Sequence, residues 1–322
     1  MQTRKLTFKV FRFNAATDVL PTYKSYTLEV RQDEVVLDIL NRIKWEQDGS
    51  LSYRRSCRHG ICGSCAIKVS GKSILACKEN VFALADLFDG NLVIEPSSTK
   101  RAVKDLIIDK KDFWSKYEKV KPYLIASIDE HPVKENLISP EVAAKIEDAD
   151  YCIQCGVCYY ACPVVEVNPD YLGPAALAKT YRFTADVRDS AKKKRLMLVD
   201  QPGMGVWDCV KCNECAEACP KGVDPIGKIT HLHNQLFEEG VAADSVAARH
   251  AVVFKNTIRK HGIIDEAEVV RYSEGTLGVM KHACEAFSML THGKLPMPWG
   301  QAKSEHLDEV KKLVDIASTN KF

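Results

Sequence analysis

The stretch Cys152-Ile-Gln-Cys155-Gly-Val-Cys158-Tyr-Tyr-Ala-Cys162-Pro163 says most about the fold, and it recurs as Cys209-Val-Lys-Cys212-Asn-Glu-Cys215-Ala-Glu-Ala-Cys219-Pro220. With the spacing C-x2-C-x2-C-x3-C-P, three thiolates can hold one cubane cluster while the fourth cysteine, set off by a proline, reaches a partner cluster. Two copies therefore predict two coupled iron–sulfur clusters. The copies begin 57 residues apart, at positions 152 and 209, which fits an internally duplicated helical module.

A third set of cysteines lies upstream of these runs. Cys57, Cys62 and Cys65 show C-x4-C-x2-C spacing and Cys77 follows, which is the plant-type spacing for a [2Fe–2S] cluster. Gly60 and Gly63 lie between these cysteines. A loop that wraps a cluster must turn backbone N–H groups toward sulfur and often needs φ > 0, which glycine permits. An ordinary tight turn is the alternative for the two glycines.

Zinc and disulfides are the alternative uses of these cysteines. Structural zinc sites usually take two separated cysteine pairs, whereas each run here packs four cysteines into eleven residues. Disulfides fit less well, since a chain of this length can bury its own core and shows no secretory apolar segment. The clusters account for twelve of the thirteen cysteines. Cys284 is left over, and we expect it to be a small apolar packing residue.

Composition bounds the class of protein. Of 322 residues, 46% are apolar and 27% are charged, which is ordinary for a soluble globular chain. No apolar stretch approaches the roughly 18 residues that a membrane helix needs, so we expect no direct membrane span. The net charge of +2 gives no electrostatic case for nucleic acid as a partner. The basic run from Lys192 to Arg195 predicts only a solvated helix face.

Hydrophobic periodicity predicts a small mixed sheet at the N-terminus. Residues 5–13 and 24–30 alternate as strands do, and residues 35–45 switch to helical spacing. Short strands follow at 66–69, 73–75 and 91–95. A sheet crossed by one helix is the β-grasp, the ferredoxin fold that normally carries C-x4-C-x2-C spacing.

The fold class that follows is α+β. It comprises a β-grasp [2Fe–2S] ferredoxin domain at 1–100, a connecting region at 101–139, an all-α helical ferredoxin domain with two cubane sites at 140–235, and a helical C-terminal extension at 236–322. The connecting region should contain an exposed helix at 112–120. Further helical patterns lie at 175–191, 227–239, 243–260, 273–290 and 306–317.

Several segments resemble the iron–sulfur subunit of succinate dehydrogenase and fumarate reductase. They are Ser52-Tyr-Arg-Arg-Ser-Cys57-Arg-His-Gly-Ile-Cys62-Gly-Ser-Cys65, Leu75-Ala-Cys77, Asn168-Pro-Asp-Tyr-Leu-Gly-Pro174 and Cys219-Pro-Lys-Gly222. The resemblance implies an electron-relay subunit with no catalytic residues of its own. It would pass single electrons between a flavoprotein, which interconverts succinate and fumarate, and a quinone-linked membrane partner. FAD and quinone would bind only in those partner subunits.

The resemblance also implies which cysteines share a cluster. The [2Fe–2S] set is Cys57, Cys62, Cys65 and Cys77; the first [4Fe–4S] set is Cys152, Cys155, Cys158 and Cys219; the second is Cys162, Cys209, Cys212 and Cys215. Family members usually lack the cysteine at the position of Cys212 and bind a three-iron cluster there. The expected inventory is therefore one [2Fe–2S] and two [4Fe–4S] clusters, with a [3Fe–4S] cluster in the second set if Cys212 is not a ligand.

A second departure concerns quinone. Many family members place tryptophans shortly after the first Cys-Pro and a histidine after the first cysteine of the second run, where this chain has Glu166-Val167 and Val210. A valine cannot donate a hydrogen bond to a quinone carbonyl. Together with Cys212, this pattern resembles the non-classical branch of the family, in which a cysteine-rich subunit like that of heterodisulfide reductase replaces the usual membrane anchor.

Two rival functions and one question of location stay open on the sequence. The chain could serve another flavin oxidoreductase, of the glycolate type or a thiol-coupled fumarate reductase, or it could be a cluster-bearing regulatory module. We expect a peripheral protein on the cytoplasmic face of the inner membrane. Export to the periplasm together with a signal-bearing partner is the alternative.

Overall fold

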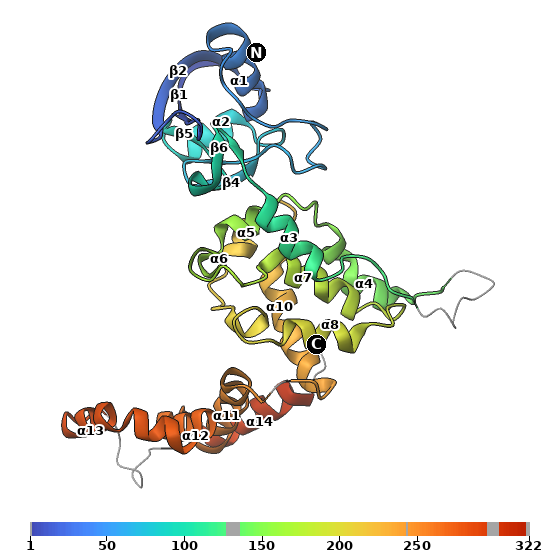
Figure 1. The fold of residues 1–322 in the computed structure, drawn as a ribbon, viewed down its shortest axis with the longest axis vertical. Coiled ribbons are helices and arrows are strands. Elements are labelled where there is room, and N and C mark those ends of the chain that lie inside the picture. Colours follow the sequence, from blue (N-terminus) through green and yellow to red (C-terminus); the bar gives the residue numbers. More distant parts are fainter. Residues whose placement is uncertain (1, 127–135, 243, 295–302, 320–322) are drawn as a thin grey trace. The chain divides into compact units, whose positions relative to one another are not determined.

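The computed structural model describes residues 2–126, 136–242, 244–294 and 303–319 (Figure 1). Residues 1–199 and 203–235 form one compact unit, and residues 200–202 and 236–322 form a second. Residues 127–135 of the predicted connecting region lie outside the described residues, as do 295–302 and 320–322 of the predicted extension.

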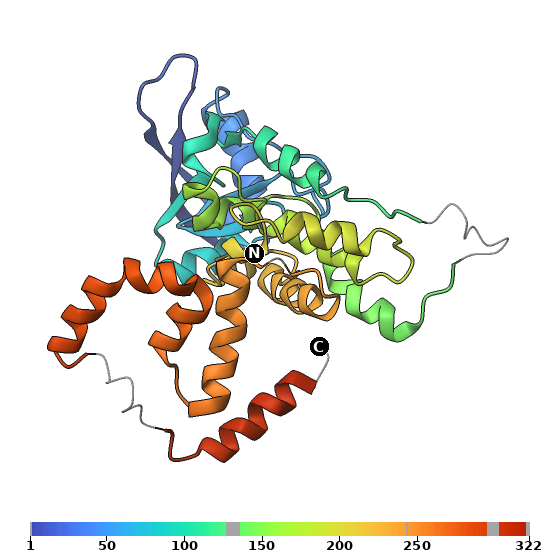
Figure 2. The same cartoon turned by 60° about the horizontal axis from the view of Figure 1, so that its bottom comes forward.

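The first unit begins with a five-stranded mixed sheet in the order β2-β1-β5-β3-β4 (Figure 1). Its strands are β1 (Thr3–Arg12), β2 (Thr22–Arg31), β3 (Ala66–Val69), β4 (Lys72–Leu75) and β5 (Leu92–Pro96). β1 pairs antiparallel with β2 in the long hairpin drawn in dark blue in Figure 2, and it pairs parallel with β5. β3 is antiparallel to both β4 and β5. This is the predicted β-grasp.

Two helices pack with this sheet around one apolar core. α1 (Val36–Arg42) continues into a π-helical turn at Ile43–Gln47, in place of the single predicted helix at 35–45. Its Ile39 is fully buried, in the same core as Phe8 and Ile94 of the sheet. α2 (Val81–Leu87) was not predicted, because its seven residues are too few to display a helical period.

The connection to the helical part is packed rather than exposed. It holds the short strands β6 (Ala102–Lys104) and β7 (Ile107–Ile108), followed by α3 (Lys111–Lys119). Phe113 of α3 is 1% exposed, and its ring meets the ring of Tyr159 edge-on at 5.6 Å. The helix predicted at 112–120 is therefore present, but it is exposed on one face only. Charged residues dominate the sequence of α3, so its pattern did not reveal the one aromatic face that packs on the helical part.

Among the described residues, α-helices from α4 to α10 follow in the first unit, and α10 leads out of it (Figure 1). They are α4 (Pro140–Asp150), α5 (Val157–Ala161), α6 (Pro163–Val167), α7 (Pro174–Thr184), α8 (Lys192–Val199), α9 (Glu214–Glu217) and α10 (Pro225–Glu238). α7 ends seven residues before the predicted limit at 191. The turn that follows is held by Asp186, which accepts hydrogen bonds from the side chains of Arg182 and Arg188.

Arg195 of α8 corrects the expectation that the basic run forms a solvated face. Its side chain is 4% exposed and pairs with Asp189 at 2.8 Å. The guanidinium also donates to the carbonyl oxygens of Val120, Lys121 and Tyr123 at 2.7–2.8 Å. Sequence alone could not separate this arginine from its exposed neighbour Lys194, because burial depends on the carbonyls that the chain before residue 126 brings to it.

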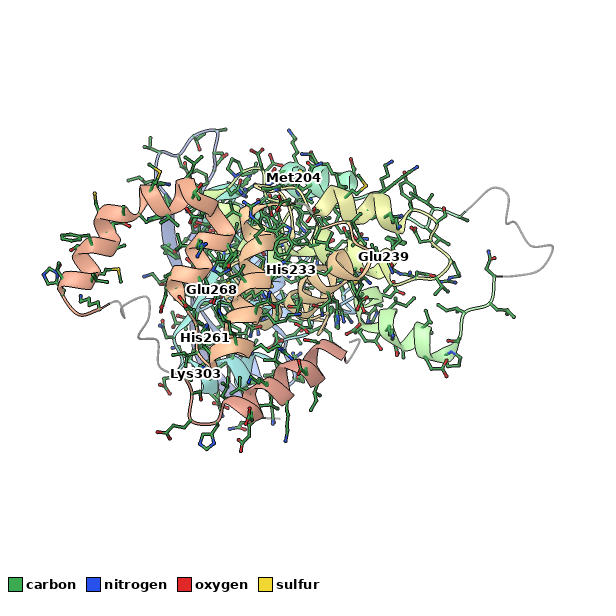
Figure 3. The ribbon with its side chains drawn as sticks, turned by 90° about the horizontal axis from the view of Figure 1, so that it is seen from below. Met204, His233, Glu239, His261, Glu268 and Lys303 are labelled. Carbon is green, nitrogen blue, oxygen red and sulfur yellow. The ribbon has the colours of Figure 1, made fainter. Side chains whose placement is uncertain are left out.

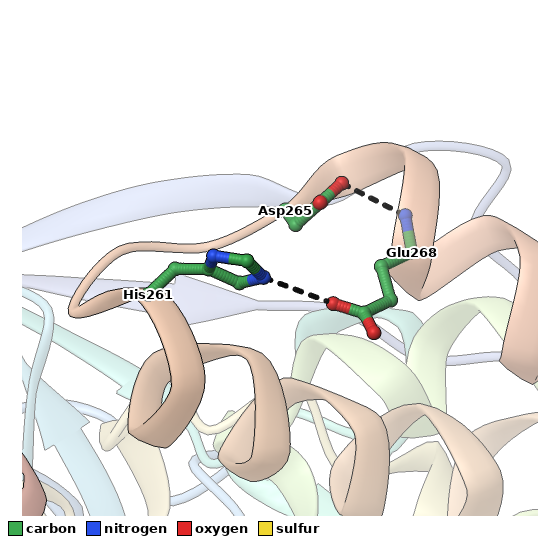
Figure 4. A group of neighbouring side chains, drawn as sticks. All are labelled: His261, Asp265 and Glu268. Carbon is green, nitrogen blue, oxygen red and sulfur yellow. Dashed lines mark hydrogen bonds and ion pairs between the residues drawn. The ribbon is translucent and has the colours of Figure 1, made fainter. Parts of the chain in front are cut away.

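The second unit contains α11 (Val246–His261), α12 (Glu266–Lys281), α13 (Ala283–Thr291) and α14 (Leu307–Thr319). Arg259 of α11 pairs with Asp315 of α14 at 2.7 Å. At the turn from α11 to α12, His261 Nε2 lies 3.4 Å from a carboxylate oxygen of Glu268 (Figures 3 and 4). Asp265 caps α12 by accepting a hydrogen bond from the Glu268 N–H at 2.9 Å (Figure 4).

Two predictions for this unit were wrong. One helix was predicted at 273–290, but α12 already begins at Glu266, where Asp265 caps it, and His282 separates it from α13. Cys284, expected to pack against apolar residues, is exposed on α13. In the parts of the chain that the structure describes, no helix combines the length and the apolar character required to cross a membrane.

Candidate iron–sulfur centres

The loop from Cys57 to Cys65 turns its amide groups toward cysteine sulfurs. The N–H groups of His59, Ile61 and Cys62 lie 3.3–3.4 Å from the sulfur of Cys57. These amide donors, that of His59 first, lower the pKa of Cys57 to about 6. Such donors favour a thiolate, which is the form that ligates iron.

Cys65 and Cys77 complete this group of four cysteines. Their sulfurs lie 3.4 Å apart, and Cys77 also accepts from the Gly60 N–H at 3.2 Å. Burial raises the pKa of Cys65 to about 12, so a thiolate there needs a positive partner. A bound metal supplies one, because it deprotonates a coordinating thiol outright. The donor set therefore fits a cluster.

The two glycines of this loop have the predicted conformation. φ is +68° at Gly60 and +67° at Gly63, a backbone region that residues other than glycine rarely adopt. At Gly63 the space is restricted as well: a Cβ atom would lie 2.8 Å from the Cα and the Cβ of Cys155. The [2Fe–2S] loop thus runs directly against the first cubane run.

The two cubane runs repeat the same backbone path. Gln154 and Lys211, which occupy equivalent positions, both have φ of +55°, and Gly156 and Asn213 follow with φ of +83° and +70°. Burial raises the pKa of Cys152 and of Cys209. In each run this turn brings an amide toward the first sulfur, so the N–H of Gln154 or of Lys211 offsets part of that rise. The internal duplication read from the sequence is therefore also a structural one.

Four cysteines line one cavity between α5 and the start of α10, with Pro220 and apolar residues completing the wall. They are Cys152, Cys155, Cys158 and Cys219. Burial raises the pKa of Cys158 well above its usual range, and the thiols of Cys155 and Cys152 raise it further. Several such thiols in an apolar wall are costly to ionise unless they share a cation.

A second cavity is lined by Cys162, Cys209, Cys212 and Cys215. Burial raises the pKa of Cys215 to about 12, and the other three thiols raise it as well. The two cavities are neighbours, since α5, which carries Cys158, packs against α9, which carries Cys215. The structure thus brings the cysteines together in the groups that the sequence analysis formed.

Tyr171 is the polar group that best tests whether a cluster fits the second cavity. Its side chain is fully buried, and the acceptor within reach of its hydroxyl is the sulfur of Cys209. Burial raises its pKa, and the sulfurs of Cys209 and Cys162 raise it further. A buried hydroxyl needs an acceptor, and here that acceptor is a cysteine sulfur. A donor directed at sulfur also fits a cluster held by the same cysteines.

Comparison with known proteins agrees with this arrangement. Residues 7–115 match a family described as a 2Fe-2S iron-sulfur cluster binding domain, and residues 148–223 match a 4Fe-4S dicluster domain. The succinate dehydrogenase iron-sulfur subunit of Coxiella burnetii is 38% identical over 237 residues, 73% of this chain and 98% of its own length. The fumarate reductase iron-sulfur subunit of Mycobacterium tuberculosis is 38% identical over 70% of this chain and 90% of its own length.

The chain belongs to the iron–sulfur subunit family of succinate dehydrogenase and fumarate reductase. As a member of this family, the subunit transfers electrons and leaves the dicarboxylate chemistry to its partners. This membership favours the electron relay over a regulatory module. It also implies a flavoprotein and a membrane anchor as partners of the subunit.

The fold of the subunit agrees with a solved relative. A chain of the Mycobacterium smegmatis Sdh1 complex in the apo form superposes with a TM-score of 0.66 at 23% identity, covering 74% of this chain and 98% of that chain. The predicted α+β class, with a β-grasp ferredoxin domain before a helical ferredoxin domain, is therefore confirmed.

Two residues near the subunit's cysteines were not recognised from the sequence. Tyr171 lies inside the quoted stretch from Asn168 to Pro174, where nothing local reveals that its hydroxyl faces sulfur. Lys110 donates to the backbone oxygen of Cys155 at 2.7 Å, across 45 positions of sequence. No periodicity or motif could have found that contact.

Proposed function

We propose that this subunit relays single electrons through one [2Fe–2S] and two [4Fe–4S] clusters. The electrons would pass between a flavoprotein that interconverts succinate and fumarate and a cysteine-rich membrane partner like that of heterodisulfide reductase. Iron–sulfur clusters supply one-electron steps between a two-electron flavin and its acceptor. The [2Fe–2S] domain would face the flavoprotein, and the second cubane would face the membrane partner.

The proposed ligands are the three sets of four cysteines. Cys57, Cys62, Cys65 and Cys77 would hold the [2Fe–2S] cluster; Cys152, Cys155, Cys158 and Cys219 the first [4Fe–4S] cluster; and Cys162, Cys209, Cys212 and Cys215 the second. The single observation that carries the second set is that Cys212 lines the same cavity as Cys162, Cys209 and Cys215. Four thiolates at one cavity are what a four-iron cluster requires.

This chain's own residues prepare the sites. Amide groups of the loops, such as those of Gln154 and Lys211, point at sulfur and stabilise its negative charge. Apolar residues make up much of the walls around Cys158 and Tyr171.

The proposed membrane partner rests on two exposed valines of the helical part, one of which lines the second cavity. Val210 is a wall residue of that cavity and is 65% exposed, and Val167, at the end of α6, is 82% exposed. Neither side chain can donate a hydrogen bond to quinone. Exposed apolar groups beside a redox site suit a protein surface as the acceptor.

Low-temperature EPR of the anaerobically purified complex, with iron and sulfide counts, tests the cluster inventory. We expect about ten irons per chain and no near-isotropic signal of an oxidised three-iron cluster. A strong signal of that kind under oxygen exclusion, with about nine irons, would mean that Cys212 is not a ligand and that the ordinary enzyme type is correct.

The partner and the location need separate measurements. Mass spectrometry of the purified complex should identify a flavoprotein and a cysteine-rich subunit, and a haem-bearing multi-helix anchor in its place would contradict the proposed partner. We further propose attachment to the cytoplasmic face of the inner membrane. Protease should then cleave the subunit in inverted vesicles and spare it in spheroplasts, whereas the opposite result would indicate co-export to the periplasm.

A further inference from the structure

Lys110 occupies the junction between two ligand loops. It directly precedes α3, and its ammonium group donates to the carbonyl oxygen of Cys155 in the first cubane run at 2.7 Å. At the same junction the [2Fe–2S] loop presses against Cys155, since a Cβ on Gly63 would lie 2.8 Å from the Cys155 Cα and Cβ and 3.1 Å from the oxygen of Ile153. The lysine therefore lies where the two loops meet.

The surroundings of this ammonium group contain sulfur rather than carboxylate. Burial lowers the pKa of Lys110, and the Cys155 and Cys62 thiols act in the opposite direction, while Arg54 adds a second positive charge nearby. Among the residues that the structure describes, no carboxylate forms an ion pair with Lys110. Its neighbour Lys111 is exposed to solvent, so the two lysines differ in environment and not in chemistry.

We propose that Lys110 is a positioning residue that raises the reduction potentials of the [2Fe–2S] and first [4Fe–4S] clusters together, by holding one positive charge between Cys62 and Cys155. Thiolate-ligated clusters carry net negative charge, and each reduction adds another electron. A half-buried cation interacts with that charge more strongly than a solvated one. The proposal rests on the ligand sets of the proposed function.

The positive charge of Lys110 can be removed or retained by substitution. Lys110→Met removes the charge and the hydrogen bond and keeps the apolar stem, whereas Lys110→Arg keeps a positive charge and a donor at this position. Lys111→Met removes a positive charge one residue away, from an exposed site. The second cubane serves as an internal reference, because neither Lys110 nor Lys111 bonds to its cysteines in the described residues.

The experiment is a potentiometric titration of the purified complex, with each cluster followed by its EPR signal. In Lys110→Met we expect the midpoint potentials of the [2Fe–2S] and first [4Fe–4S] clusters to become more negative, with the larger shift at the [4Fe–4S] cluster whose loop accepts the hydrogen bond. The second cubane should keep its potential. Lys110→Arg should keep the potentials of both clusters close to those of the wild type. Lys111→Met should leave all three potentials unchanged.

Several outcomes would overturn the inference: unchanged potentials in Lys110→Met, equal shifts of all three clusters, or the same shift in Lys110→Arg as in Lys110→Met. Iron and sulfide counts keep this test distinct from that of the proposed function. A wild-type complex without the three clusters would refute the function, whereas full counts with unmoved potentials would refute only the role of Lys110. If Lys110→Met fails to assemble, Lys110→Gln provides a second neutral variant.

Discussion

Gly63 and Cys155 touch so closely that no side chain fits between the [2Fe–2S] loop and the first cubane run. A Cβ on Gly63 would lie 2.8 Å from both the Cα and the Cβ of Cys155, and these atoms belong to a ligand residue and its backbone. Neither can move without moving a sulfur. The distance between two redox sites therefore depends on the absence of one methyl group.

Gly63→Ala should separate the two loops. The alanine adds a backbone cost of about 1–2 kcal/mol at positive φ, and it also has to displace Cys155. We expect a weaker spin–spin interaction between the reduced [2Fe–2S] and first [4Fe–4S] clusters by EPR. Gly71→Ala is the matched control, because Gly71 also has positive φ, +85°, but has open space around it. An equal effect of both variants would show that backbone strain alone is responsible.

Cys212→Ser should convert the second site to a three-iron cluster. The site then keeps Cys162, Cys209 and Cys215 as its thiols, which is the ligand number of the three-iron form. The oxidised variant should gain the near-isotropic EPR signal and lose about one iron per chain. Cys284→Ser changes an exposed cysteine on α13 and should alter neither quantity. Unchanged iron in Cys212→Ser would remove Cys212 from the ligand set.

Tyr171→Phe should lower the reduction potential of the second cluster. It removes one buried hydroxyl that faces the sulfurs of Cys209 and Cys162 and leaves the ring in place. A hydrogen bond to a charged acceptor contributes about 1.5–3 kcal/mol, which sets an upper limit of roughly 65–130 mV for one electron if the bond stabilises only the reduced cluster. Tyr181→Phe is the control, since that buried hydroxyl donates to the Lys145 carbonyl at 3.2 Å. An unchanged potential of the second cluster in Tyr171→Phe would contradict this prediction, and the control should leave that potential unchanged.

Arg195→Met should destabilise the first unit. It leaves the carboxylate of Asp189 buried without its cation and three carbonyls without a donor. Breaking a buried ion pair in this way costs about 3–5 kcal/mol, which lowers the apparent Tm by on the order of 10 °C. Lys194→Met, at the exposed neighbouring position, should stay within about 0.5 kcal/mol of the wild type in the same thermal unfolding experiment.

The sequence predicted the sheet well because its strands carry a strong local signal. Phe8 and Val10 alternate with exposed residues along β1, and both are buried in the core. The helices fared less well where a tertiary contact decides the outcome. α3 is amphipathic around Phe113, but only tertiary contacts, with the rings of Tyr159 and Tyr160, make that face an interior one.

Cysteine spacing is a local property, and so it determined from the sequence alone that this chain carries a [2Fe–2S] loop and a duplicated cubane run. The same thiolates could only be grouped by analogy until the fold placed Cys219 beside Cys152 and Cys162 beside Cys209. Tertiary structure alone decided the contact of Gly63 with Cys155, the hydrogen bond of Lys110 and the orientation of the Tyr171 hydroxyl. The physical reason is that these contacts join segments tens of residues apart, and packing rather than sequence pattern brings such segments within bonding distance.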